Sequence, residues 1–104
     1  MNIMKTINLL FPVAILFVVG CTKTPQACFV ADKGKVAKVN EEVQFDASCS
    51  TNATSYSWDF GDGTAASEGA SVKHKYSTAA IYNVKLTAKN KRKENTSTVA
   101  LTIN

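Results

Sequence analysis

Few residues in this chain of 104 residues could take part in catalysis. The only histidine, His74, alternates with Val72 and Tyr76, so it falls on the apolar face of a predicted strand. A catalytic triad needs a nucleophile and an orienting acid beside its base, and no G-x-S-x-G pattern occurs in the sequence. We therefore interpret His74 as a hydrogen-bonded core residue rather than a general base, and we expect no enzymatic activity.

Residue types that bind metals or phosphate are also sparse. A zinc site needs several His, Cys or acidic ligands, and the five glycines are scattered rather than grouped into a phosphate-binding loop. Asp59 and Asp62 are near neighbours, and Asp46 could lie on an adjacent strand. Calcium needs about six to eight oxygen ligands, however, and this spacing is not that of an EF-hand. We expect no cofactor, with these three aspartates as the candidate ligands if calcium binds.

An uninterrupted apolar run occupies residues 9–19, with Lys5 before it and Gly20 and Cys21 after it. A positive start, a short apolar run and a small residue at the cut are typical of a secretory signal peptide. The run is too short to span a bilayer, because a spanning helix needs about 20 apolar residues. We predict that residues 1–20 are a cleaved signal peptide, and the alternative is an uncleaved N-terminal anchor.

The segment 18–21, Val-Val-Gly-Cys, resembles the lipobox of bacterial lipoproteins. The resemblance implies that Cys21 becomes the lipidated N-terminus, carrying acyl chains such as palmitate. Several chains together hold a protein on a bilayer far better than one chain does. Thr22 follows the cysteine, so the aspartate that is often linked to inner-membrane retention is absent. We expect residues 21–26 to be the lipidated cysteine and a short tether, at the outer membrane or cell surface.

Cys28 and Cys49 are the two cysteines that lipidation leaves over. Disulfides persist in the oxidising setting of exported proteins, so we predict a bond between them; two buried free thiols are the alternative. If residues 28–33 pair with residues 42–49 as antiparallel strands, Cys28 opposite Cys49 makes the paired numbers sum to 77. Closing a loop of this length contributes about 3 kcal/mol in the chain-entropy model.

The rest of the chain alternates between apolar and polar residues with a period of two, which is typical of half-buried strands. The alternating runs are residues 43–47, 56–60, 72–76, 82–88 and 99–103. Turn signals separate them at residues 50–52, 61–63 and 89–91. With residues 27–32 they make at least six short strands, which predicts an all-β, immunoglobulin-like (Ig-like) β-sandwich.

The segment 58–63, Trp-Asp-Phe-Gly-Asp-Gly, resembles the hallmark motif of the polycystic kidney disease (PKD) domain family, whose members are Ig-like β-sandwiches. Flanking residues agree in order and spacing: Phe-Asp-Ala-Ser at 45–48, His-Lys-Tyr at 74–76 and Tyr-Asn-Val-Lys-Leu-Thr at 82–87. The resemblance implies one PKD domain over residues 27–104, and it adds calcium binding as a property of some members. Ala79 and Ala80 stand where the family usually has glycine, which affects one turn.

We interpret the motif residues as structural. Trp58 and Phe60 point to one face and can supply much of the core, and Gly63 suits a turn after Asp62. Tyr82 is placed like the tyrosine-corner residue of Ig-like domains, whose hydroxyl returns to the backbone. The residues that the resemblance assigns to the fold are Trp58, Asp59, Phe60, Gly61, Asp62, Gly63, His74, Tyr76 and Tyr82.

Four cations lie in the predicted turn between the last two strands: Lys89, Lys91, Arg92 and Lys93. Without residues 1–20 the chain has 11 Lys and Arg against 8 acids, a net charge of +3. We interpret the cluster as a solvated turn that blunts strand edges; contact with lipopolysaccharide or acidic polysaccharide is the alternative. We do not expect nucleic-acid binding, because an exported, membrane-tethered domain rarely meets nucleic acid.

Two classes of function remain for a lipid-anchored domain of the bacterial cell envelope. The first is a non-catalytic module that binds an envelope protein or a glycan. Most aromatic residues fall on predicted inward positions and only Phe29 is ambiguous, which favours a protein partner. The second is a structural spacer or an accessory subunit of an envelope complex. The fold alone does not decide between them.

Overall fold

The computed structural model describes residues 23–104. The predicted signal peptide and the lipidation site Cys21 lie outside the described residues. The described part contains no helix that is long and apolar enough to cross a membrane.

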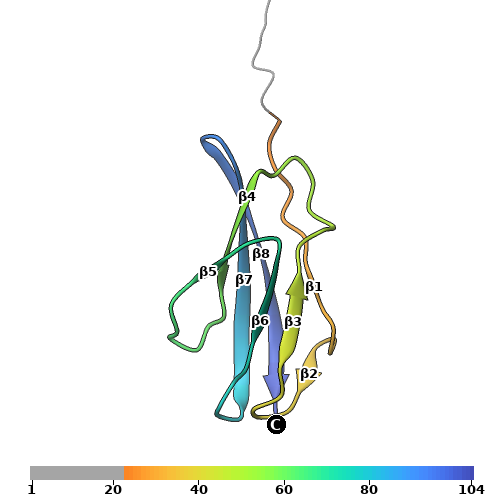
Figure 1. The fold of residues 1–104 in the computed structure, drawn as a ribbon, viewed down its shortest axis with the longest axis vertical. Helices are drawn as coiled ribbons and strands as arrows, with labels where there is room; N and C mark the ends of the chain where they lie inside the picture. Colours follow the sequence, from red (N-terminus) through yellow and green to blue (C-terminus); the bar gives the residue numbers. More distant parts are fainter. Residues whose placement is uncertain (1–22) are drawn as a thin grey trace, which may run out of the picture.

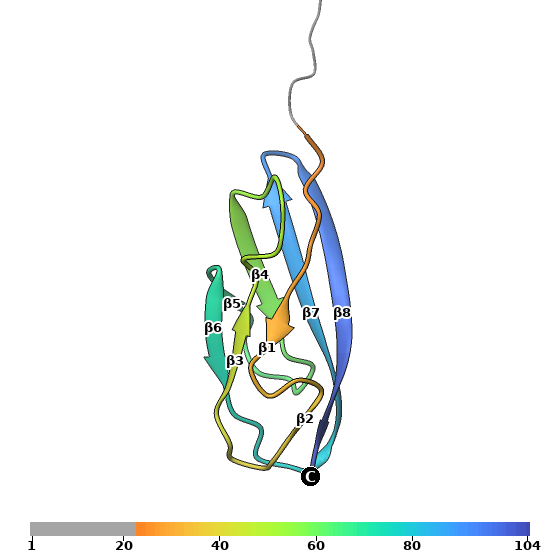
Figure 2. The ribbon, with the colours of Figure 1, turned by 90° about the vertical axis from the view of Figure 1, so that its right-hand side faces the viewer.

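Eight strands form two sheets that face each other (Figures 1 and 2). The smaller sheet has the order β1-β3-β6, from β1 (Val30–Ala31), β3 (Val43–Asp46) and β6 (Ser71–His74). The larger sheet has the order β2-β8-β7-β4-β5, from β2 (Val36–Ala37), β8 (Lys93–Ile103), β7 (Ala80–Asn90), β4 (Ser55–Asp59) and β5 (Ser67–Glu68). The predicted all-β, Ig-like sandwich is confirmed.

The core lies between the sheets and follows the predicted alternation. Val43 and Phe45 of β3 are buried, whereas Gln44 between them is exposed. Phe45 contacts both Trp58 and Phe60, with ring centroids 5.8 and 5.6 Å apart. Burial of such aromatic rings is the main favourable term in a domain of this size. The largest fully buried hydrophobic side chains are Trp58, Tyr76, Phe45, Phe60, Leu86, Leu101, Val43 and Val84.

The pairing of β1 with β3 differs by one residue from the predicted register. Val30 pairs with Asp46 and Ala31 with Phe45, so the paired numbers sum to 76 rather than 77. The two cysteines lie outside this ladder, because the chain enters a turn directly after β3, in which the Asp46 carboxylate accepts a hydrogen bond from the Ser48 amide at 2.8 Å. Cys49 therefore reaches Cys28 from a turn and not from a strand position.

Candidate functional site

The segment 58–63 forms the end of β4 and the turn after it. The Asp59 carboxylate accepts a hydrogen bond from the Gly61 amide at 2.9 Å, which closes the turn. Gly61 has a φ of 77°, and a Cβ atom there would lie 2.6 Å from the carbonyl oxygen of Asn83 on β7. Only glycine tolerates both the left-handed backbone and this close approach. Gly61 therefore serves the packing of the turn against β7.

Asp62 joins this turn to the opposite sheet. Its Oδ1 accepts hydrogen bonds from the amide and the hydroxyl of Thr64, at 3.2 and 2.6 Å. Its Oδ2 lies 2.6 Å from Nε2 of His74 on β6. Burial acts to raise the pKa of Asp62, but the hydrogen bonds from Thr64 and His74 outweigh burial and hold the pKa below its ordinary value. The carboxylate is therefore a charged link between the two sheets.

His74 packs as part of the core edge. Its ring stacks on Phe60 with centroids 4.0 Å apart and meets the edge of Tyr76 at 4.8 Å. The Thr64 hydroxyl donates to the same carboxylate as His74 rather than contacting the ring. In a catalytic triad the histidine contacts the nucleophile, so this arrangement of Thr64, Asp62 and His74 does not activate the hydroxyl.

Two tyrosine hydroxyls return to the backbone. The hydroxyl of Tyr76 donates to the Phe60 carbonyl oxygen at 2.9 Å, and burial, followed by the nearby Asp62 carboxylate, raises the pKa of Tyr76. The hydroxyl of Tyr82 donates to the Thr78 carbonyl oxygen at 2.7 Å. This second bond closes the turn in which alanines replace the family's usual glycine. Both tyrosines therefore have structural contacts.

The three candidate calcium ligands do not come together. Asp46 bonds the Ser48 amide, Asp59 bonds the Gly61 amide and Asp62 bonds Thr64 and His74. Within residues 23–104, no group of three or more His, Cys, Asp or Glu side chains is placed to hold a metal ion. The geometry gives Asp46 and Asp59 local roles in turns, and it makes Asp62 a link between the sheets.

A disulfide joins Cys28 and Cys49, with their Cα atoms 5.3 Å apart. The Ser50 side chain reinforces this link, because its Oγ accepts from the Cys28 amide at 2.9 Å and donates to the Cys28 carbonyl at 2.7 Å. The bond ties the segment that enters β1 to the turn after β3. The predicted disulfide is confirmed, and the alternative of two free thiols is wrong.

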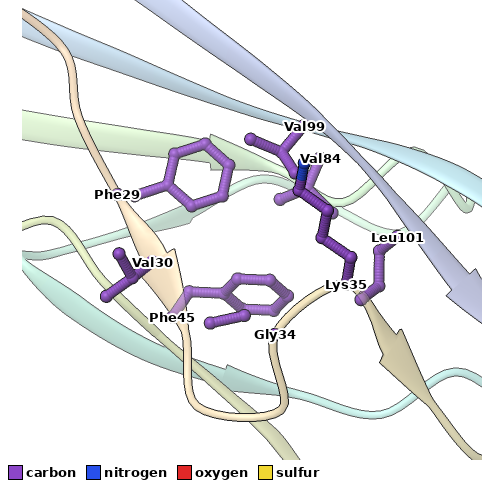
Figure 3. Close-up of a pocket in the computed structure, with 9 residues that line it drawn as sticks. Phe29, Val30, Gly34, Lys35, Phe45, Val84, Val99 and Leu101 are labelled. Carbon is purple, nitrogen blue, oxygen red and sulfur yellow. The ribbon is translucent and has the colours of Figure 1, made fainter.

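An apolar cleft of about 220 Å³ opens between the two sheets, beside the turn that joins β1 to β2 (Figure 3). Val30 of β1 is 60% exposed, and its side chain points to the other side of the strand from Phe29 (Figure 3). Lys35 supplies the only charged side chain of the lining. The cleft is lined by Phe29, Val30, Ala31, Gly34, Lys35, Phe45, Val84, Val99 and Leu101.

The sequence did not predict this cleft. Phe29, the aromatic residue of ambiguous position, lies in its wall and is 9% exposed. Val30 and Lys35 were not singled out, since β1 and β2 have only two residues each and produce no alternating pattern. The turn between these strands, which forms one rim of the cleft, gives no sequence signal of binding.

A shallower and more polar groove lies where the chain crosses from β5 to β6. It is lined by Thr54, Ser55, Tyr56, Glu68, Gly69 and Ala70. Tyr56 is half-buried, and the same lining includes the hydroxyl residues Thr54 and Ser55 and the carboxylate residue Glu68. An aromatic face beside hydrogen-bonding groups is a combination that can hold a polar ligand such as a sugar.

The four predicted basic residues lie at the tip of the long β7–β8 hairpin. Asn90 pairs with Lys93, so Lys91 and Arg92 form the two-residue turn between the strands. Lys89, Lys91, Arg92 and Lys93 are all exposed. The tip is a concentrated positive surface on an otherwise mixed-charge domain.

An all-β sandwich with a structural turn motif defines an Ig-like domain. Within this class the chain belongs to the PKD domain family, whose model matches residues 26–103. The PKD1 domain of Vibrio anguillarum Epp is 26% identical with a TM-score of 0.64, covering 80% of this chain and 96% of that one. The PKD1 domain of the Vibrio cholerae metalloprotease PrtV is 28% identical with a TM-score of 0.64, covering 79% and 99%.

Two further similarities concern larger proteins. A carbohydrate-binding module of the β-sandwich superfamily superposes with a TM-score of 0.74 and 27% identity, over 80% of this chain and 35% of that one. Collagenase ColA of Clostridium perfringens (strain 13 / Type A) is 38% identical over 73 residues, which are 66% of this chain and 6% of the collagenase. The chain therefore matches one small part of the collagenase.

Proposed function

We propose that this chain is a non-catalytic binding module, held by a lipid anchor at Cys21 in the bacterial cell envelope. The PKD fold supports a binding role, and the similarity to a carbohydrate-binding module points the same way. The contacts of His74 and Asp62 support the absence of catalysis, because both side chains are engaged in holding the sheets together. The lipobox at residues 18–21 supports the anchor.

The lining of the apolar cleft indicates which class of ligand the module binds. Its lining contains no hydroxyl, amide or carboxylate side chain, so it offers few groups that could fix the hydroxyls of a sugar. A cavity of about 150 Å³ is enough to hold benzene, so 220 Å³ can hold one aromatic or branched aliphatic side chain. The module therefore binds a protein partner that inserts an apolar side chain beside Phe29 and covers Val30 at the rim.

Matched substitutions test this use of the cleft. Val30 and Ile81 are both exposed apolar strand residues, at 60% and 70% exposure, and only Val30 lines the cleft. Peptides with apolar residues are first selected on an array with the purified domain, and their affinities are then measured by titration. We expect Val30→Glu to weaken binding at least about tenfold, since a partner that covers the rim of the cleft must desolvate the new charge, whereas Ile81→Glu leaves it unchanged. Equal affinities of the two variants would exclude the cleft.

Glycan binding is the second candidate, supported by the carbohydrate-binding neighbour and by the groove around Tyr56. A glycan array probed with the same domain tests it, with Glu68→Gln as the variant, because Glu68 is exposed and its loss leaves the core intact. Binding that Glu68→Gln weakens and Val30→Glu spares would place the ligand in the groove. A domain that binds neither array would favour the spacer or accessory role.

A further inference from the structure

The basic hairpin tip, Lys89, Lys91 and Arg92, is the strongest concentration of charge on the domain that the proposed ligand sites leave unused. Residues 89–94 contain four cations and one acid, Glu94, which leaves a net charge of +3 in six residues. That value equals the net charge of all residues after Gly20. The other residues of the domain carry equal numbers of positive and negative charges, so the net positive charge of the domain lies at this tip.

The tip lies at the same end of the molecule as the N-terminal tether. The amide of Ala27 donates to Oδ1 of Asn95 on β8 at 2.8 Å, and Gln26 forms a bridge with Thr51. The side chain of Asn90 donates to the Asn52 carbonyl at 2.8 Å, beside that bridge. Figures 1 and 2 show the first described residues and the β7–β8 turn at one end and the C-terminus at the other.

The distance from the tether to the lipidation site is short. Lys23 is the first described residue and is exposed. Cys21 precedes Lys23 by two residues in the sequence, and two residues of chain span at most about 7 Å even when fully extended. A bilayer that holds the acyl chains of Cys21 therefore faces the end of the domain that carries the hairpin tip.

Lys91 holds a backbone conformation that glycine adopts more readily. Lys91 has a φ of 56°, in the left-handed region that favours glycine. A lysine there costs about 1–2 kcal/mol relative to an unstrained position. Strained positions of this kind cluster at functional sites.

We propose that the basic hairpin tip binds the anionic headgroups of the bilayer that holds the chain's own lipid anchor. The proposal rests on the proposed anchor for its setting, and it assigns a membrane-binding surface to Lys89, Lys91 and Arg92. Each Lys or Arg near an anionic membrane strengthens binding about fivefold, equivalent to ~1 kcal/mol. A lipid anchor and a basic patch that act together hold a protein on a membrane in a fixed orientation.

The test uses the domain without its anchor, so that its outcome does not depend on Cys21. Residues 23–104 contain the whole core and the disulfide, and the two Vibrio PKD domains were solved as isolated domains of the same extent. A chain beginning at Thr22 is sedimented with vesicles of phosphatidylcholine alone, or with added phosphatidylglycerol. We expect binding only to the anionic vesicles, and we expect 1 M salt to abolish it, because the Debye length falls to about 3 Å.

Two triple variants that lose the same charge locate the surface. Lys89→Ala, Lys91→Ala and Arg92→Ala remove the tip cations, and we expect vesicle affinity to fall about a hundredfold. Lys33→Ala, Lys38→Ala and Lys75→Ala are the control. Two of these lysines lie near the C-terminal end of the domain. Lys38 precedes Val39, whose amide donates to the Asn104 carbonyl, and Lys75 precedes Tyr76, whose carbonyl accepts from the Asn40 amide. Equal losses in the two variants would overturn the proposal, because net charge alone would then explain binding.

A soluble polyanion tests whether the tip binds a bilayer in preference to an anionic polymer. Dextran sulfate is titrated into the same chain, and its affinity is compared with that of the anionic vesicles per unit of negative charge. Tighter binding to the soluble polymer would overturn the membrane assignment in favour of an acidic polysaccharide. The tip could bind vesicles while the full-length chain proved to be unlipidated. That result would refute the anchor, and the membrane-binding role of the tip would stand.

Discussion

At the scale of single residues, the PKD motif is explained by contacts between the sheets. Gly61 allows the β4 turn to pack on Asn83, and Asp62 links that turn to His74 on the opposite sheet. The sequence predicts the burial of Trp58 because it alternates with polar neighbours. The pairing of Asp62 with His74 could not be predicted, because it depends on the chain crossing between sheets after β5.

The two motif glycines provide a matched pair for testing the close approach. Gly61 and Gly63 both have left-handed φ values, 77° and 82°, but a Cβ atom at Gly63 would have no neighbour within 4 Å. We expect Gly63→Ala to lower the free energy of unfolding by about 1–2 kcal/mol. Gly61→Ala should cost at least about 2 kcal/mol more, because backbone must move. Urea denaturation of both variants measures this, and equal costs would show that φ alone requires glycine.

The link between Asp62 and His74 predicts a dependence of stability on acid pH. The folded pKa of Asp62 lies below its ordinary value of 3.8. Its carboxylate therefore stabilises the fold above about pH 4, and this stabilisation is lost as the pH falls through 3.8 towards the folded pKa. We expect Asp62→Asn to cost about 1–3 kcal/mol at pH 7 and to flatten the decline between pH 5 and pH 2.

The control for this prediction is Glu68→Gln. The Glu68 side chain makes no hydrogen bond or ion pair among the described residues, so its removal should change stability little at any pH. Denaturation curves are recorded at several pH values for both variants. If Asp62→Asn followed the pH profile of the unsubstituted chain, the carboxylate would have no part in acid unfolding.

At the scale of elements, the sequence predicted strands best where one face is buried. The run over residues 99–103 was predicted, but β8 begins at Lys93, because residues 93–98 extend the hairpin with mostly polar side chains. β2 and β5 were missed as separate strands because two residues are too short for a period to be visible. The hairpin turn lies at Lys91 and Arg92, one residue later than the predicted turn signal at 89–91.

The β7–β8 turn separates the effects of charge and strain. Lys91 has a positive φ and Arg92 does not, so Lys91→Gly should raise the free energy of unfolding by up to about 1 kcal/mol. Arg92→Gly should lower it by about 0.5–1 kcal/mol, because it only adds flexibility. Each removes one cation, so both should weaken binding to anionic vesicles about fivefold. A vesicle affinity that followed stability rather than charge would argue against an electrostatic surface.

At the scale of the whole molecule, the domain has one end with the tether and the basic tip, and a cleft on its side. The sequence predicted the sandwich because a six-residue motif and the alternation of strands agree. It could not predict the cleft, because the cleft depends on how the turn at Gly34 and Lys35 covers the gap between the sheets. The ligand surfaces thus follow from the arrangement of elements, whereas the fold follows from local patterns.

The anchor is the prediction on which the orientation of the whole molecule depends. We expect the full chain, expressed in a bacterial host and extracted from membranes, to begin at Cys21 and to exceed the mass of residues 21–104 by its acyl groups. Reduction should add two hydrogens, because Cys28 and Cys49 form the one disulfide of the described residues. Cys21→Ser is the control: it cannot form the thioether, so it should yield an unacylated chain. A full chain that is recovered soluble and without acyl mass would refute the anchor. Within residues 23–104, the basic tip would then be the surface that brings the domain to a membrane, and the vesicle experiment would measure the affinity of that surface.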